Sequence, residues 1–227
     1  MTRLPMFALS CVPRLAAALA MTMALSACQV GGVAGDAVLG VEVREVAPFH
    51  EVVVTSVLAA NVRLQSSGAP RVEVRGDRNL LAFVSTRVVD ERLYLTIDGA
   101  GVSPRLPLEV HLSVAGLRRV EVNGGASVDL KGAFGDELQL YARDAGELSA
   151  SGDVRHLVVE ASGGATLRAG GLVAERVELR ASGASAAEVC ATRELEVSVS
   201  GTSLATYCCH PTSVKTEVTA DAALHER

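Results

Sequence analysis

A short phrase rich in Ser, Gly and Ala returns at nearly constant intervals through the second half of the chain. Its copies begin at Asn123, Arg143, Ser162, Ser182, Ser200 and Thr219. A period of about 19 residues is too short for paired-helix repeats and is typical of one coil of a β-solenoid. The sequence thus predicts an all-β protein, a parallel β-helix or β-solenoid with coils of about 19 residues.

Residues before each phrase alternate strictly between apolar and mostly polar side chains, which is the pattern of a strand with one buried face. The predicted inward residues are Leu138, Leu140 and Ala142, then Leu157, Val159 and Ala161, then Val177, Leu179 and Ala181, then Leu195, Val197 and Val199. A second short strand is predicted after each phrase. No proline occurs between Pro107 and Pro211, as strands paired on both sides require. Val159, Leu179 and Val197 should therefore stack in one shared interior.

The N-terminal half also has strand patterns, but with less regular spacing. Residues 71–75, 92–97 and 106–114 alternate cleanly and are separated by turn signals such as Gly76-Asp77 and Asp98-Gly99. We interpret 41–227 as a single β-solenoid domain. Within it, 41–114 would form irregular first strands and a cap, and 115–227 the regular coils.

The N-terminus has the features of an export signal. Two arginines precede an apolar run that ends in Leu25-Ser26-Ala27-Cys28. This order is similar to a bacterial lipobox, so we predict a lipoprotein signal peptide over 1–27, an acylated Cys28 and a flexible tether over 28–40. The alternative is an ordinary signal peptide cut near Ala27. Gln29, where Asp would indicate retention in the inner membrane, favours a protein anchored to the outer membrane of the cell envelope.

Charge and composition exclude several partners. The formal net charge is −5, and removal of residues 1–27 takes away two arginines and no acidic residue, which makes it −7. Nucleic acids and anionic lipid headgroups both require basic patches, so neither is an expected partner. Aromatic residues make up 3% of the chain and tryptophan is absent, which argues against an aromatic platform for stacking bases or sugars.

Three cysteines remain in the predicted exported chain besides the acylated Cys28: Cys190, Cys208 and Cys209. Cys190 and Cys208 both occupy the same position relative to the start of their repeats, so the solenoid makes them direct neighbours on adjacent coils. Paired strands lie about 4.8 Å apart, which suits a disulfide. A bridge from Cys190 to Cys208 or Cys209 is one prediction, and packed free thiols are the alternative. We predict no metal site and no cofactor, because His210 alone does not complete a four-ligand set.

The chain resembles the head GIN domain family of putative auto-transporter adhesins, a bacterial domain of unknown function. The residues that carry the resemblance are Val72-Glu73-Val74-Arg75-Gly76-Asp77, Asn79-Leu80-Leu81, Arg92-Leu93-Tyr94-Leu95-Thr96-Ile97 and the repeated Ser-Gly-Ala-Ser phrases that close with Tyr207. The resemblance covers roughly Val41 to Pro211. It implies a β-helical fold, a role in adhesion and no catalytic residue. Two departures are the absence of glycine from Arg143-Asp144-Ala145 and the Cys208-Cys209 pair after Tyr207.

We therefore expect a non-enzymatic, lipid-anchored adhesin or binding scaffold whose ligand is a surface polysaccharide or a protein. Its outward side chains should form two rows along the stack. One row is Arg119, Gln139, Glu178, Glu196 and Lys215, and the other is Glu121, Glu160, Arg180 and Glu217. Taken one by one, such charges are typical of a solvated face.

Two alternatives remain open. A polysaccharide-acting enzyme would need clustered carboxylates, for which Asp144 beside Arg143 and Glu178 beside Glu196 are the candidates. The five histidines, His50, His111, His156, His210 and His225, share no motif. A structural protein could assemble through its coil ends, but the degraded last repeat is typical of a charged cap.

Overall fold

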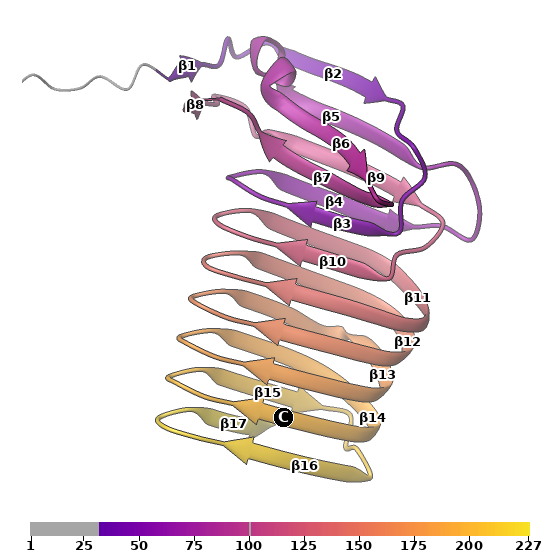
Figure 1. Cartoon of the computed structure of the whole chain (residues 1–227), viewed down its shortest axis with the longest axis vertical. Helices are drawn as coiled ribbons and strands as arrows, with labels where there is room; N and C mark the ends of the chain where they lie inside the picture. The colour runs from indigo at the N-terminus through magenta and orange to yellow at the C-terminus, as the bar shows by residue number, and fades with distance from the viewer. Residues whose placement is uncertain (1–31, 100) are drawn as a thin grey trace, which may run out of the picture. The chain divides into compact units, whose positions relative to one another are not determined.

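The repeats wind into a β-solenoid of about five turns, as their period predicts (Figure 1). The computed structural model describes residues 32–99 and 101–227. Adjacent coils pair in parallel throughout the repeats. Each coil has two long sides, which we call face A and face B. They are joined on one side by a tight corner and on the other by a wide bend, at the left and right of Figure 1.

Long strands carry the chain around the bend, so one strand contributes to both faces. These are β11 (Ser127–Ala142), β12 (Glu147–Ala161), β13 (Thr166–Ala181) and β14 (Ala186–Val199). The first half of each strand lies in face B and the second half in face A. Face A also contains β10 (Arg119–Val122) and β16 (Ser213–Val218), and face B contains β15 (Leu204–Cys208) and β17 (Ala223–Glu226).

The core lies between the two faces and follows the predicted register. Leu140, Val159, Leu179 and Val197 are partners on successive coils, and none is more than 2% exposed. The prediction that Val159, Leu179 and Val197 share one interior is therefore confirmed. Side chains of this kind pack well between closely spaced sheets. Stacking makes the apolar interior continuous from coil to coil, although no single coil could bury it alone.

The Ser-Gly-Ala phrases form the tight corner. Their second residues all take a left-handed backbone, with φ between +60° and +79°: Gly124, Asp144, Gly163, Gly183, Gly201 and Ala220. Asp144 adopts this conformation in the copy that lacks glycine, because aspartate tolerates the left-handed region better than most residues. The corner is therefore retained there. Two positions later the side chain is small and turns inward, as in the buried Ser185 and Ser203.

The N-terminal strands extend both faces, but not in chain order. Face A continues from β10 to β3 (Glu51–Val54), β7 (Arg92–Ile97) and β6 (Val84–Val89). Face B continues from β11 to β4 (Ala59–Leu64), β9 (Glu109–Val114), β5 (Arg71–Asp77) and β2 (Leu39–Arg44). The coil made by β3 and β4 thus lies between strands that follow it in sequence. Strands predicted over 71–75 and 92–97 are confirmed, and the third begins at Glu109 rather than at residue 106.

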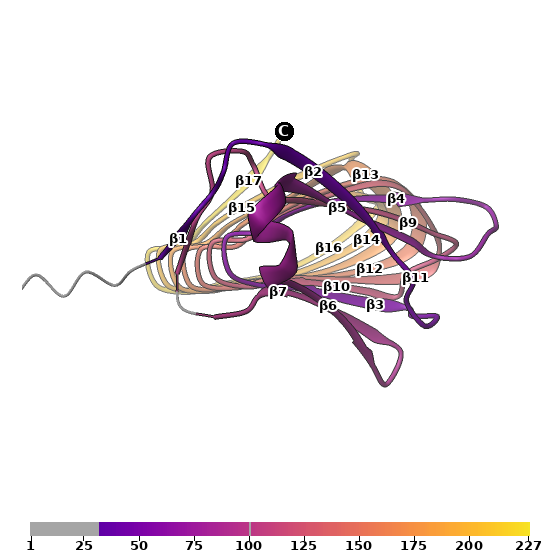
Figure 2. The ribbon, with the colours of Figure 1, turned by 90° about the horizontal axis from the view of Figure 1, so that it is seen from above.

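The N-terminal end of the coils is covered by the 3-10 helix η1 (Arg78–Phe83), which buries Leu80 and Leu81 (Figure 2). The buried Asp77 precedes it. Its carboxylate accepts hydrogen bonds from the backbone N–H groups of Ala37 at 2.6 Å, Arg105 at 2.8 Å and Leu106 at 2.9 Å. Burial acts to raise the pKa of Asp77, but these three donors outweigh it and hold the pKa below its usual range. One carboxylate thereby joins three segments of the cap.

The predicted tether over 28–40 is described from residue 32 onward. There, β1 (Val33–Ala34) pairs with β8 (Val102–Ser103), and β2 begins at Leu39. The predicted signal peptide and the acylation site Cys28 lie outside the described residues. Within the residues the structure describes, no helix is long and apolar enough to cross a membrane.

Candidate binding surface on the outside of the coils

The bend carries two rows of charged and polar side chains that continue from coil to coil. One row is Asp136, Arg155, Glu175, Arg193 and Thr212, and the other is Glu137, His156, Arg176, Glu194 and Ser213. Together they line a shallow groove of about 660 Å³, which we call the bend groove. Register shifts near the bend in β11, β12 and β13 help the strands turn and aim these residues outward.

Ion pairs between successive coils connect the side chains of the bend groove. Arg155 Nε donates to Asp136 Oδ1 at 2.9 Å, and Arg193 pairs with Glu175 at 3.1 Å. Side chains in these two pairs are between 50% and 79% exposed. Exposed pairs of this kind contribute at most about 1 kcal/mol each to stability. The pairs therefore add little to the fold and leave both signs of charge available to a ligand.

A second depression of about 710 Å³ adjoins the bend groove and shares Asp136 and Glu137 with it. Phe134 lines this depression and is 48% exposed, although it is a large apolar side chain. Leu117 and Arg119 are also among its lining residues. An apolar ring beside charged groups gives this part of the surface both hydrophobic contact area and polar partners.

Arg119 also belongs to an ordered cluster on face A, which we call the Tyr141 cluster. Its guanidinium lies 4.1 Å from the centre of the Tyr141 ring, and that of Arg143 lies 5.2 Å from the same centre. Glu121, whose side chain is 13% exposed, pairs with Arg119 at 3.2 Å and with Arg143 at 2.5 Å. Arg143 also contacts Glu160 at 3.4 Å. Because aromatic and carboxylate groups hold both arginines, this cluster presents a preorganised surface.

Both predicted outward rows have the register expected of them. Gln139 stacks beside Arg119, Glu178 beside Glu196, and Glu196 beside Lys215, with Val158 filling the position between Gln139 and Glu178. Tyr141 and Ser198 complete the row that contains Glu121, Glu160, Arg180 and Glu217. Sequence reasoning missed the rows of the bend. Their signal was the alternation of charge along Asp136, Arg155, Glu175 and Arg193, which recur with the period of the repeat.

Candidate groups for catalysis are already held by other side chains or stand alone. Glu178 contacts His156 Nε2 at 3.2 Å and Arg180 at 3.8 Å. Arg143 is bound in the Tyr141 cluster, while the neighbouring Asp144 is an exposed corner residue. His111 pairs with Glu109 at 3.0 Å on face B. Glu178 and Glu196 are thus neighbours on face A, whereas Asp144 lies at the tight corner and His111 on face B.

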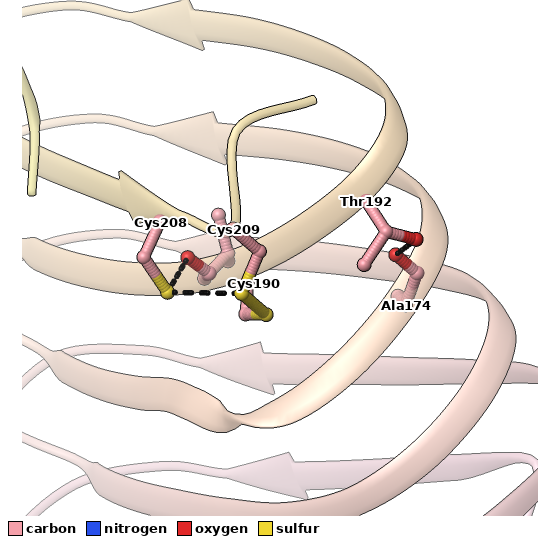
Figure 3. Close-up of a disulfide and its surroundings, with 6 residues drawn as sticks. Ala174, Cys190, Thr192, Cys208 and Cys209 are labelled. Atoms are coloured by element: carbon pink, nitrogen blue, oxygen red, sulfur yellow. Dashed lines mark hydrogen bonds between the residues drawn. A yellow bond between two sulfur atoms is a disulfide. The ribbon is translucent and has the colours of Figure 1, made fainter. Parts of the chain in front are cut away.

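The cysteines lie where the repeat places them, on adjacent coils. Cys190 and Cys208 are direct partners of β14 and β15. The disulfide, however, links Cys190 to Cys209 instead of Cys208, with a Cα–Cα distance of 5.4 Å (Figure 3). Cys209 follows the end of β15 with φ at +77°, outside the regular strand geometry that keeps Cys208 beside Cys190. Among the described cysteines, Cys208 is left as a free thiol.

The Cys208 thiol is half-buried, and its Sγ donates to the Val189 carbonyl oxygen at 3.6 Å. Burial raises the pKa of this thiol, and the negative charge of Glu188 acts in the same direction. The nearby Arg227 has the opposite effect, which is weaker. Cys208 is therefore predominantly a neutral thiol at pH 7.

Solved structures share this fold. A putative adhesin from Bacteroides fragilis has 17% sequence identity and a TM-score of 0.72, with 86% of this chain and 100% of that chain covered. A putative adhesin from Parabacteroides distasonis has 23% identity and a TM-score of 0.57, with 86% and 100% covered. A putative lipid binding protein from P. distasonis has 14% identity and a TM-score of 0.54, with 86% and 99% covered.

No curated protein matches the chain. A family profile does match, over residues 48–211. This range includes most of the irregular first strands, with Gly76-Asp77, and most of the regular coils. The resemblance inferred from the repeats and from the cap is thereby confirmed. The chain belongs to the family described as putative auto-transporter adhesin, head GIN domain.

Proposed function

We propose that the protein is a non-enzymatic adhesin, lipid-anchored through Cys28 to the bacterial outer membrane, that binds an extended protein ligand on the outside of its coils. The ligand would lie along the bend groove and the adjoining Tyr141 cluster. Family membership supports adhesion, and the order of residues around Cys28 supports the lipid anchor.

The observation that carries the proposal is the placement of Phe134, Arg119 and Tyr141 on neighbouring parts of one surface. Aromatic and arginine side chains are enriched at protein–protein interfaces and dominate their binding energy. Here two arginines are already oriented against Tyr141, so a ligand would not have to order them. The exposed ion pairs of the bend groove adjoin the Phe134 depression on one side, where they supply polar groups.

Adhesion can be tested with cells that display the full chain on immobilised extracellular proteins and glycans. The test variant is Phe134→Ala combined with Tyr141→Ala, and the matched control is Arg63→Ala combined with Lys131→Ala on face B. We expect the test variant to weaken binding of a protein ligand at least about tenfold, because hot-spot residues cost about 2 kcal/mol or more. Equal binding by both variants would place the ligand elsewhere, and binding to glycans alone would change the ligand class.

The anchor and its location need separate measurements. Metabolic labelling with a fatty acid should mark the wild-type protein and not Cys28→Ser. Protease treatment of intact cells should degrade the solenoid if it faces outward. If the protein is labelled but resists protease on intact cells, the lipid anchor is supported. The solenoid then faces inward, which contradicts adhesion.

The enzyme alternative predicts a different result. Incubation with a panel of polysaccharides should then release shorter products, and Glu178→Gln should abolish that release. If the protein is the binding module proposed from its family, no product should be released.

A further inference from the structure

Three cysteine sulfurs meet at one point between adjacent coils near the C-terminal end of the stack. Cys190 comes from β14, Cys208 ends β15 and Cys209 follows it. The Sγ atoms of all three lie within 4.8 Å of one another, and those of Cys208 and Cys209 are 3.5 Å apart (Figure 3). Among the described residues they form the one group of three or more metal-capable side chains at such distances.

The register of the coils explains why the sulfurs converge. Parallel pairing places Cys208 beside Cys190. Cys209 and His210 then take left-handed conformations, with φ at +77° and +50°. The chain turns here, and the Cys209 sulfur reaches Cys190. The sulfurs are therefore brought together by the backbone of two coils rather than by flexible side chains.

A structural disulfide explains only two of these cysteines. The third, Cys208, is a reduced thiol in contact with the bridge, although an alanine or serine would fill the same place without risk of thiol exchange. A site that uses all three sulfurs would account for its presence. Cysteine thiolates are ligands that select soft cations such as Cu(I).

We propose that the three cysteines, once the Cys190–Cys209 disulfide is reduced, bind one Cu(I) ion as trigonal thiolate ligands. An external dithiol supplies the two electrons and two protons that convert the bridge to two thiols, and is itself oxidised to a disulfide. Cu(I) then displaces one proton from each of the three thiols. This site is independent of the proposed adhesion.

The distances fit such an ion. Metal–sulfur bonds of about 2.3 Å place three sulfurs of a shared ion about 3.8 to 4.0 Å apart. Reduction separates the Cys190 and Cys209 sulfurs, and the present limit of 4.8 Å then leaves only a small adjustment. Zn(II) prefers four ligands, whereas this group supplies three sulfurs. Three-coordination favours Cu(I).

The experiment uses the full chain, reduced with a phosphine under anaerobic conditions and titrated with Cu(I) against a chromogenic chelator. The background is the variant with Cys190→Ser, Cys208→Ser and Cys209→Ser, which retains Cys11 and Cys28. We expect the wild-type chain to bind one more equivalent of Cu(I) than this variant. X-ray absorption of that ion should show three sulfur neighbours.

The single variant Cys208→Ser isolates the third ligand and can still form the Cys190–Cys209 disulfide. Under oxidising conditions it should melt as the wild type does, which verifies its fold. When reduced, this variant should have an affinity for Cu(I) at least about tenfold lower than that of the reduced wild type. Changes to residues that only contact metal ligands already cost tenfold to hundredfold in metal affinity. The oxidised wild-type chain should bind no more Cu(I) than the background variant.

Three results would overturn the proposal: Cu(I) binding that Cys208→Ser leaves unchanged, a stoichiometry equal to that of the background variant, or a preference for Zn(II) over Cu(I) in direct competition.

Discussion

Gly183 packs directly against Gly163 in the tight corner of the preceding coil. A Cβ atom on Gly183 would lie 2.8 Å from the Gly163 carbonyl oxygen, and the same oxygen accepts the N–H of Ala184 at 2.7 Å. The φ of Gly183 is +79°. Backbone conformation and the contact between coils therefore both disfavour a side chain at Gly183, although Asp144 and Ala220 occupy the equivalent position in other coils.

Replacement of Gly183 by alanine should destabilise the solenoid. The left-handed conformation alone costs roughly 1–2 kcal/mol for an L-residue, and the contact with Gly163 adds to this. We expect a loss of about 2 kcal/mol or more in urea unfolding. Gly171→Ala, in the bend of the same coil, is the control, since its Cβ would meet nothing closer than 3.5 Å. Equal losses in both variants would argue against the corner as the cause.

The Cys190–Cys209 disulfide should stabilise the C-terminal coils. It joins residues separated by 19 positions, and closure of a loop of that size is worth about 3 kcal/mol in the chain-entropy model. In a Cys208→Ser background, which prevents Cys190 from pairing with its direct neighbour, Cys209→Ser should therefore lower the free energy of unfolding by about this amount under oxidising conditions. A reductant should remove most of the difference between the two proteins. A variant as stable as the oxidised wild type would show that the bridge does not constrain the chain.

The stability of the N-terminal cap should depend on pH through Asp77. Its pKa in the folded protein is lowered, so the ionised carboxylate favours the folded state. That contribution is fully present above the unfolded pKa of about 3.9 and is lost as the pH falls through the lower folded value. Asp77→Asn should thus be less stable than the wild type at pH 7, and the gap should narrow below about pH 4. A gap that is constant with pH would exclude titration of Asp77.

Alkylation of Cys208 should be slow at neutral pH. Burial raises the pKa of its thiol, and only the thiolate reacts readily with iodoacetamide. Mass spectrometry of the peptide that contains Cys208 should show slower labelling in the native protein than after denaturation. The native rate should continue to rise above about pH 8.5, the ordinary thiol pKa. Rapid labelling at pH 7 would mean that the thiol is exposed and ionised.

Much of the fold could be predicted because the coils repeat. The constant interval between phrases and the strict alternation were enough to place Leu179 against Val159 and Val197, since adjacent coils repeat the same local structure. The corner at Asp144 was less certain from sequence, because glycine is absent there. Aspartate adopts the same left-handed backbone, so a change of residue type did not change the turn.

The parts that could not be predicted depend on pairing between distant segments or on local irregularities. Alternation predicted strands over residues 71–75 and 92–97, but it does not show that β5 pairs with β2 and β9, or that β7 pairs with β3 and β6. In the bend, changes of register pair Val173 with Cys190, although the two residues lie at different distances from the start of their repeats. Local irregularity also decided the disulfide. Regular spacing makes Cys208 the direct neighbour of Cys190, but the turn after β15 brings Cys209 to Cys190.

The position of the β3–β4 coil has a consequence for how the chain assembles. Its partners on one side, β7 and β9, and on the other, β10 and β11, all come later in the sequence. When the chain emerges from its N-terminus, β3 and β4 have partners on one side only after residue 114, and on both sides only after β11 has reached residue 131. Assembly therefore does not proceed one layer at a time from the first strand. The β3–β4 segment instead adds as a strand pair to later parts of the chain, after β7, β9, β10 and β11 are available to pair with it.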